Sequence, residues 1–268
     1  MQLQNGLNFH AYNMNKQLLF NFKKDISNID IPQKLNNPFG DFIPELARVA
    51  AKEFQEFIAK ESKNWKYDFE QQKGKMFGVL VVQNEDKAYG YLGTISGKIP
   101  GDFNCDKFTP SILDASAGEL FLDKGMNSLT EIGHQIKNSK NKVEQQQLTA
   151  QRKQKSQALQ QLLFENYRIL NNLGTKQNVL EIFLQSSHGN PPAAAGECAA
   201  PKLLQTAFNN HLKPVALAEF WWGESTLNIE KKHKAFYPAC KNKCRPILEY
   251  MLGDRELYNS SKKVIAGE

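Results

Sequence analysis

The sequence predicts an α/β fold, in which a small mixed sheet with flanking helices is interrupted by a polar helical insertion. Three apolar runs of strand length, at 76–82, 88–96 and 214–222, predict the sheet. A long segment at 127–173 has helical composition but few regular apolar positions, and it predicts the insertion. The expected order is therefore helix, strand, strand, insertion, helix, strand, helix.

The first expected element is a helix at 41–60, which follows a polar and turn-rich start at 1–40. Asp41 is the expected N-cap, and Pro44 falls in the first turn, where a missing N–H is tolerated. Apolar residues recur every three or four positions along this helix: Ile43, Leu46, Ala47, Ala50, Phe54, Phe57 and Ile58. We expect this stripe to pack against the sheet.

The first two strands are expected to form a β-hairpin. The turn between them is the four-residue segment 84–87, with the sequence Asn-Glu-Asp-Lys. A loop of this length joins neighbouring antiparallel strands. After the second strand, Pro100 and Gly101 open an irregular segment that continues past Pro110.

The insertion at 127–173 is rich in glutamine and lysine. We expect either one long projecting helix or an antiparallel coiled-coil hairpin that bends near Ser139 or Thr149. Gly174 is the expected C-cap. A coiled coil would also permit pairing with a partner or with a second copy of the chain.

Positive charge is concentrated in this insertion. Residues 137–168 hold seven basic side chains against two acidic ones, whereas the whole chain holds 34 against 28, for a net charge of +6. Six of these bases are candidate RNA-binding residues: Lys137, Lys140, Lys142, Arg152, Lys153 and Lys155. An RNA-binding arm would use them to neutralise phosphates, and a solvated spacer without a ligand is the alternative interpretation.

A compact block follows the Gly-, Pro- and Ala-rich loop at 189–196. It is expected to contain a helix at 198–209, a strand at 214–222 and a helix at 238–252 that ends at Gly253. The chain then divides into an N-terminal part of the α/β domain (1–99), the linker and insertion (100–185), a C-terminal part of the domain (186–253) and a loose tail (254–268).

Three of the four cysteines, Cys198, Cys240 and Cys244, fall in this block. Cys240 and Cys244 are one helical turn apart, and Cys198 begins the preceding helix, where the helix N-terminus favours a thiolate. Three thiolates with a water, His188 or His233 as fourth ligand would form a structural zinc site. Buried reduced thiols that pack as small apolar groups are the alternative.

The cysteine pattern resembles that of the cytidine-deaminase-like fold. There, a helix–strand–helix unit carries one ligand in a His/Cys-x-Glu motif and two more in Pro-Cys-x-x-Cys. In this chain Ala200 stands where the proton-shuttling Glu would be, and three residues separate Cys240 from Cys244. The resemblance implies the fold and zinc, and a zinc-dependent nucleoside or base deaminase would need another acid/base, such as Glu197 or Glu219.

Four longer blocks resemble the N-terminal region of long-form RluA-type pseudouridine synthases: 74–82 (GKMFGVLVV), 196–204 (GECAAPKLL), 218–223 (AEFWWG) and 236–248 (FYPACKNKCRPIL). This resemblance spans about 20–252. It implies an accessory, RNA-binding region of an enzyme that isomerises uridine in rRNA or tRNA, with structured RNA and a synthase catalytic domain as partners. The family's His-Arg-Leu-Asp motif is missing here, so no catalytic residue is carried over and activity of the chain alone is not expected.

Other features narrow the expected cellular setting. No apolar run approaches the roughly 20 residues of a membrane helix. The first 22 residues have no continuous apolar core of the secretory type. We therefore expect a cytoplasmic protein with reduced or metal-bound cysteines and no membrane partner.

Overall fold

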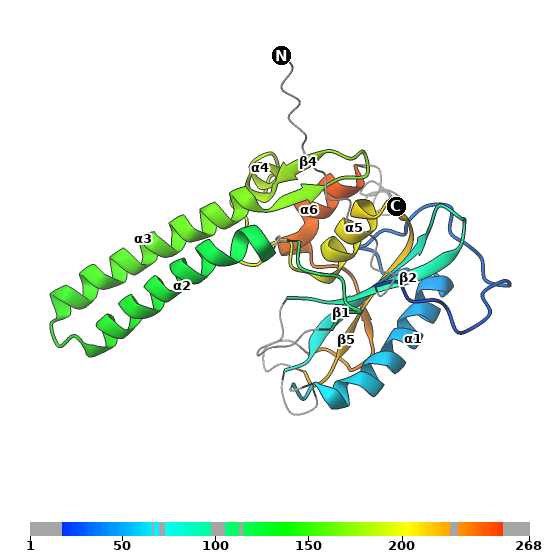
Figure 1. Cartoon of the computed structure of the whole chain (residues 1–268), viewed down its shortest axis with the longest axis horizontal. Helices are drawn as coiled ribbons and strands as arrows, with labels where there is room; N and C mark the ends of the chain where they lie inside the picture. Colours follow the sequence, from blue (N-terminus) through cyan, green and yellow to red (C-terminus); the bar gives the residue numbers. More distant parts are fainter. Residues whose placement is uncertain are drawn as a thin grey trace, which may run out of the picture.

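The computed structural model shows a four-stranded sheet with helices on both faces and a two-helix arm that projects from this body (Figure 1). It describes residues 18–65, 67–69, 73–97, 105–112, 115–225 and 230–253, with only the backbone at 115–121. The predicted tail at 254–268 and the first 17 residues lie outside the described residues. The described helices are α1 (Glu45–Glu61), the short 3₁₀ helix η1 (Ser62–Asn64), α2 (Ala115–Asn138), α3 (Lys142–Asn166), α4 (Val179–Leu184), α5 (Ala199–Asn209) and α6 (Lys241–Leu252).

The main sheet has the strand order β2-β1-β5-β6, and each neighbouring pair of strands is antiparallel. Its strands are β1 (Lys75–Gln83), β2 (Tyr89–Ile95), β5 (Lys213–Trp222) and β6 (Phe236–Tyr237). The α/β class and the three longer strands are confirmed. The mixed sheet was a wrong prediction, because β5 returns directly into β6 and, within the described residues, no crossover helix leads to a parallel neighbour.

Side chains of β1 alternate between two separate cores. Phe77, Val79 and Val81 pack with α1 on one face of the sheet, and Leu80 and Val82 pack with α5 and α6 on the other. Both faces of β1 are therefore covered. This burial explains why the strand is continuously apolar instead of alternating between polar and apolar residues.

Helix α1 begins at Glu45, with Pro44 as an extended N-cap (ψ 147°). The predicted start at Asp41 is wrong, because the residue before a proline is disfavoured in the α region and Ile43 holds that position. The apolar stripe is confirmed from Leu46 onward, since its residues from there to Ile58 lie at the sheet.

The helix α1 lies very close to β2 at Gly93. A Cβ atom at this position would lie 2.3 Å from Cε2 of Phe54. On the same helix the buried Glu53 carboxylate accepts hydrogen bonds from the backbone N–H groups of Lys23 (3.0 Å) and Lys24 (2.9 Å). The glycine thus permits the close approach, and Glu53 fixes the segment that precedes the helix.

The insertion is an antiparallel helical hairpin of α2 and α3, which we call the arm (115–166). Asn141 caps α3 by accepting a hydrogen bond from the Val143 N–H (2.9 Å). Of the predicted alternatives, the hairpin that bends near Ser139 is confirmed. The single helix and the bend at Thr149 were wrong, because Thr149 lies inside α3 and its hydroxyl donates to the Gln145 carbonyl.

The helical prediction fails after Asn166. A two-stranded sheet follows there, β3 (Arg168–Leu170) and β4 (Lys176–Asn178), before the short α4. Gly174, the predicted C-cap, instead occupies the turn of this hairpin with φ +80°. Ile169 is fully buried in the body, so its tertiary packing outweighs the helical pattern of the preceding residues.

The C-terminal helix–strand–helix block is confirmed. Cys198 and Cys240 are the N-caps of α5 and α6, and Gly253 ends α6 in the left-handed conformation (φ +66°). In the part of the chain that the structure describes, no helix combines the length and the apolar character needed to cross a membrane.

Candidate functional site

The fold brings the three predicted zinc ligands together. The first turns of α5 and α6 place Cys198 and Cys240 as N-caps, and Cys244 follows one turn into α6, where it is fully buried. Both helices pack in the same core, on one face of the main sheet. We call Cys198, Cys240 and Cys244 the thiol cluster.

The thiols of this cluster lie close enough to change one another's pKa values. The pKa of Cys240 is lowered, mainly because the Cys198 and Cys244 thiols interact with it and stabilise its thiolate. The Cys240 thiol and burial raise the pKa of Cys198, against the opposing effect of Cys244. The Cys198 and Cys240 thiols and burial all raise the pKa of Cys244. The cluster therefore holds its first negative charge on Cys240, at the positive end of the α6 dipole.

In the described residues, no group of three or more His, Cys, Asp and Glu side chains has the arrangement of a metal site. The donor set nevertheless has the chemistry of a zinc site, since three cysteine sulfurs converge. The two candidate fourth ligands have other contacts. Nδ1 of His233 accepts a hydrogen bond from the Gly223 N–H (2.9 Å), and the His188 ring meets the edge of Phe183.

A buried carboxylate lies beside the thiol cluster. Glu219, on β5, is 6 % exposed, and its Oε1 accepts a hydrogen bond from the Ala200 N–H (2.8 Å) in the first turn of α5. Burial raises the pKa of Glu219 to about 7, against the opposing effects of the Ala200 hydrogen bond and the Lys231 charge. Glu219 is also the carboxylate whose charge acts on the Cys198 thiol.

Lys231 completes this charged group, and sequence analysis did not identify it. Its Nζ lies 4.7 Å from the centre of the Tyr237 ring and 5.2 Å from that of Trp221, with the Met76 sulfur at 3.1 Å. Burial lowers the pKa of Lys231, and the Glu219 charge opposes this effect. A lysine in a loop after β5 carries no sequence signal that would link it to a carboxylate twelve residues earlier.

Little space remains around Glu219. The cavity that it borders with Asn36, Tyr237 and Pro238 has a volume of about 10 Å³. That volume is about the smallest that holds one water molecule. The cavity therefore has room for a water-sized species and none for a nucleobase.

The other carboxylate considered as an acid/base, Glu197, has different partners. Its Oε1 accepts hydrogen bonds from the Ser111 hydroxyl (2.5 Å) and from the Tyr167 hydroxyl. Its Oε2 is buried without a hydrogen-bond partner among the described residues. Because Tyr167 directly follows α3, Glu197 connects the base of the arm to the loop that precedes Cys198.

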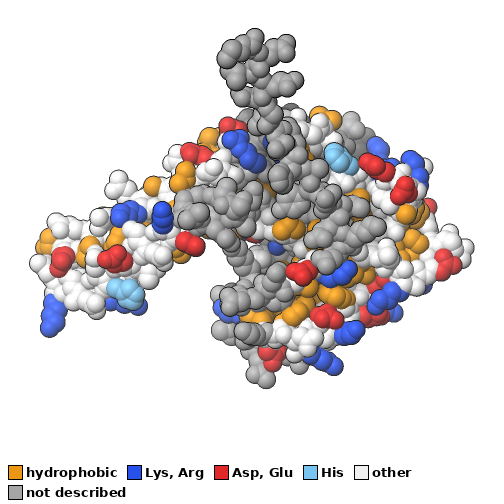
Figure 2. All heavy atoms as spheres, in the orientation of Figure 1, with side chains coloured by type: hydrophobic (Ala, Val, Ile, Leu, Met, Phe, Trp, Pro, Cys, Tyr) orange, Lys and Arg blue, Asp and Glu red, His pale blue; other side chains and the backbone are white. Residues whose placement is uncertain are grey.

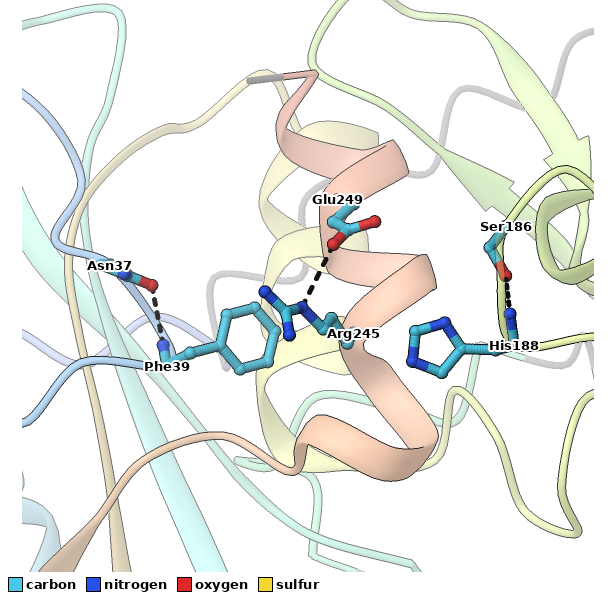
Figure 3. Close-up of polar contacts among 6 residues, drawn as sticks. All are labelled: Asn37, Phe39, Ser186, His188, Arg245 and Glu249. Atoms are coloured by element: carbon cyan, nitrogen blue, oxygen red, sulfur yellow. Dashed lines mark hydrogen bonds and ion pairs between the residues drawn. The ribbon is translucent and has the colours of Figure 1, made fainter. Parts of the chain in front are cut away.

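The outer side of α6 is fastened to the segment before α1. Arg245 Nε pairs with Glu249 Oε1 (3.2 Å), and its guanidinium lies 5.9 Å from the centre of the Phe39 ring (Figure 3). His188 lies beside the same helix in this view, with its backbone N–H donating to the Ser186 hydroxyl (3.1 Å). The contact of Arg245 with Phe39 therefore joins α6, the helix of Cys240 and Cys244, to the segment before α1.

All six predicted RNA-binding residues lie on the outer part of the arm, but they fall into two groups. Arg152 Nε donates to the Leu129 carbonyl (3.2 Å) and Lys155 Nζ donates to the Ser128 hydroxyl (3.1 Å), so these two fasten α3 to α2. The other four bases are exposed and have no hydrogen-bond or ion-pair partner among the described residues: Lys137, Lys140, Lys142 and Lys153. Figure 2 shows basic side chains along the arm and at its outer end.

The arm uses its apolar residues internally. Leu129 and Ile132 of α2 are buried, and a Cβ atom at Gly125 would lie 2.6 Å from the Leu159 side chain of α3. The exposed large apolar residues on the described part of the arm are Met126 on α2 and Val143 and Leu162 on α3, and the latter two lie near opposite ends of α3. The described surface of the arm is therefore polar and positively charged, without a continuous apolar stripe.

The chain matches no model of a known protein family, no curated protein and no solved structure.

Proposed function

We propose that this chain is an RNA-binding accessory region, of the kind found at the N-terminus of long-form RluA-type pseudouridine synthases. The observation that carries the proposal is the arm, which projects from the body and presents four exposed lysines at its outer part. Its catalytic partner would be a synthase domain, and its ligand would be structured RNA. Uridine isomerisation itself would belong to that domain.

The arm favours a nucleic-acid ligand over the two alternative interpretations. A coiled-coil interaction module needs an exposed apolar seam, whereas Leu129 and Ile132 are already buried within the hairpin. A neutral spacer has no need for a biased charge. Residues 129–155 hold six basic side chains against two acidic ones, Glu131 and Glu144. An accumulation of unpaired lysines is the feature that phosphate binding requires.

In this proposal the thiol cluster is a structural zinc site within a cytidine-deaminase-like body. Cys198, Cys240 and Cys244 would be the ligands. Zinc would replace the protons that the three thiols now share and would link the first turns of α5 and α6. The support is the convergence of three sulfurs at two helix N-termini, the arrangement that the deaminase-like motifs imply.

The proposal is tested by measuring affinity for a folded RNA in a filter-binding titration. The test variant replaces Lys137, Lys140, Lys142 and Lys153 with Gln, and we expect it to lose at least tenfold in affinity. The matched control replaces four exposed lysines of the body, Lys52, Lys60, Lys63 and Lys213, with Gln, and so removes the same net charge. Equal losses in both variants, or no RNA binding by the parent, would refute the arm as the RNA-binding element.

A second candidate function is a zinc-dependent deaminase-like enzyme, and one observation favours it. Ala200 stands at the motif position of the proton-shuttling Glu, and its backbone N–H donates a hydrogen bond to Glu219. Glu219 therefore brings a carboxylate from β5 to the neighbourhood of that position. The cavity of about 10 Å³ beside Glu219 counts against a nucleobase substrate. Incubation with cytidine, deoxycytidine and short oligonucleotides decides the matter, because deamination adds one dalton and no gain in mass excludes it.

A further inference from the structure

Resting on the proposed function, we infer that the arm binds the sugar–phosphate backbone of double-stranded RNA and not unpaired bases. The inference concerns the outer part of the arm, from Leu129 to Lys155. Three properties support the inference: the lack of aromatic side chains, the spacing of the free lysines, and the exposed glutamines that accompany them on α3.

The outer part of the arm lacks the aromatic side chains that stack on unpaired bases. Single-stranded RNA is recognised mainly by aromatic rings and arginine planes that stack on splayed bases. The sequence has no Phe, Tyr or Trp between residues 122 and 163. Arg152 is the one arginine in this segment, and its Nε is held by the Leu129 carbonyl. His134 is the one remaining ring in the segment.

The free lysines form a rigid array. Lys142 and Lys153 are eleven residues apart on α3, which is close to three complete turns, so they lie on the same side of the helix about 16 Å apart. Lys137 and Lys140 add charge at the tip. Lysine acts as a point charge on phosphate and reads no sequence. A fixed row of such charges suits the regularly spaced phosphates of a duplex, whereas a flexible single strand must first be straightened.

Exposed glutamines share α3 with these lysines: Gln146, Gln147 and Gln151 lie between Lys142 and Lys153 in the sequence, and Gln154 and Gln157 follow Lys153. A glutamine amide offers both donors and an acceptor, and a ribose 2′-hydroxyl is likewise donor and acceptor. Contacts of this kind are available on an RNA duplex and missing from a DNA duplex. We therefore expect the arm to prefer RNA among duplexes.

The test compares three ligands with the full chain: an RNA duplex of about 20 base pairs, one of its strands in an unstructured sequence, and the DNA duplex of the same sequence. We expect the RNA duplex to bind at least tenfold more tightly than the single strand and several-fold more tightly than the DNA duplex. The Lys137/Lys140/Lys142/Lys153→Gln variant should lose this binding. His134→Ala should retain it, because no ring is needed.

The possible failures are distinguishable. Equal or tighter binding of the single strand, or loss of binding in His134→Ala, would overturn the duplex inference and leave the proposed RNA-binding function intact. Equal binding of the two duplexes would overturn the role of the 2′-hydroxyl. Absence of binding to any of the three ligands would overturn the proposed function itself. Far-ultraviolet circular dichroism of each variant confirms that the arm remains helical.

Discussion

The Glu219 carboxylate accepts a 2.8 Å hydrogen bond from the backbone N–H of Ala200. This bond links the middle of the main sheet to the first turn of α5, directly beside the Cys198 N-cap. A carboxylate at a helix N-terminus interacts favourably with the helix dipole when it is charged, whereas burial favours its neutral form. The protonation of Glu219 is therefore linked to the stability of the body.

The pH dependence of stability should report this buried acid. Folding raises the pKa of Glu219 from an ordinary 4.5 to about 7, so the folded protein binds this proton more tightly than the unfolded chain does. The stabilisation from this proton is fully present below pH 4.5 and is lost as the pH rises towards 7. Glu219→Gln keeps an acceptor for the Ala200 N–H and cannot ionise. In zinc-free, reduced protein, the stability of the parent relative to Glu219→Gln should fall by about 3 kcal/mol between pH 4.5 and pH 7.5.

Urea denaturation of both proteins at a series of pH values measures this difference. Groups that titrate equally in the two proteins cancel in the comparison. A difference that stays constant with pH would show that Glu219 titrates normally in the folded protein.

Zinc content should depend on the thiol cluster. Purified under reducing conditions, the parent should contain about one zinc per chain, and Cys198→Ser and Cys240→Ser should each lose it. Loss of a structural metal destabilises a domain by several kcal/mol, so we expect each variant to lose about 3–5 kcal/mol of unfolding free energy. Cys105→Ser is the matched control, because Cys105 packs in the other core, and it should retain the metal. A parent without zinc would leave the cluster as packed thiols.

A side chain at Gly93 should disrupt the packing of α1 against the sheet. An added Cβ would lie 2.3 Å from the Phe54 ring, so Gly93→Ala should lower the unfolding free energy by about 2–3 kcal/mol. At Gly40 the nearest atom would be 3.5 Å away, an ordinary contact, and Gly40→Ala should change stability by less than about 0.5 kcal/mol. Equal effects of the two substitutions in chemical denaturation would contradict this close packing.

The cap at the tip should stabilise the arm. Asn141→Ala removes the acceptor for the Val143 N–H and should destabilise the outer part of α3 by about 1 kcal/mol. Amide hydrogen exchange should therefore become roughly fivefold faster across the first turns of α3. Asn127→Ala, at an exposed position inside α2, should leave exchange unchanged or slower, because alanine is the better helix former. Faster exchange in the control alone would show that the cap is unimportant.

Local sequence patterns predicted the elements whose structure depends mainly on local interactions. The β1–β2 hairpin, the helix–strand–helix block and the break in the arm near Ser139 follow from apolar period, turn residues and capping. The predicted start of α1 at Asp41 was wrong because Pro44 disfavours the helical conformation at Ile43. The hairpin of β3 and β4 was missed because Ile169 adopts its conformation through contacts that the body supplies.

In the candidate sites too, some features follow from the sequence and others depend on tertiary contacts. Helix positions alone bring Cys240 and Cys244 together, and the pairing of two helices brings Cys198 to them. Lys231 approaches Glu219 because of the path that the loop after β5 takes. This loop has no periodic sequence pattern from which its path could be predicted. Likewise, the division of the arm's bases into free lysines and the fastened Arg152 and Lys155 appears only once α2 and α3 are paired.

The most direct test of the RNA-binding arm is the salt dependence of duplex RNA affinity. Four lysine–phosphate contacts predict a slope of about −3.6 for the logarithm of the association constant against the logarithm of salt concentration, or about a 150-fold loss between 50 and 200 mM salt. Replacement of Lys137, Lys140, Lys142 and Lys153 by Gln should bring that slope close to zero. The same slope in the parent and in this variant, or a parent that does not bind, would contradict the account.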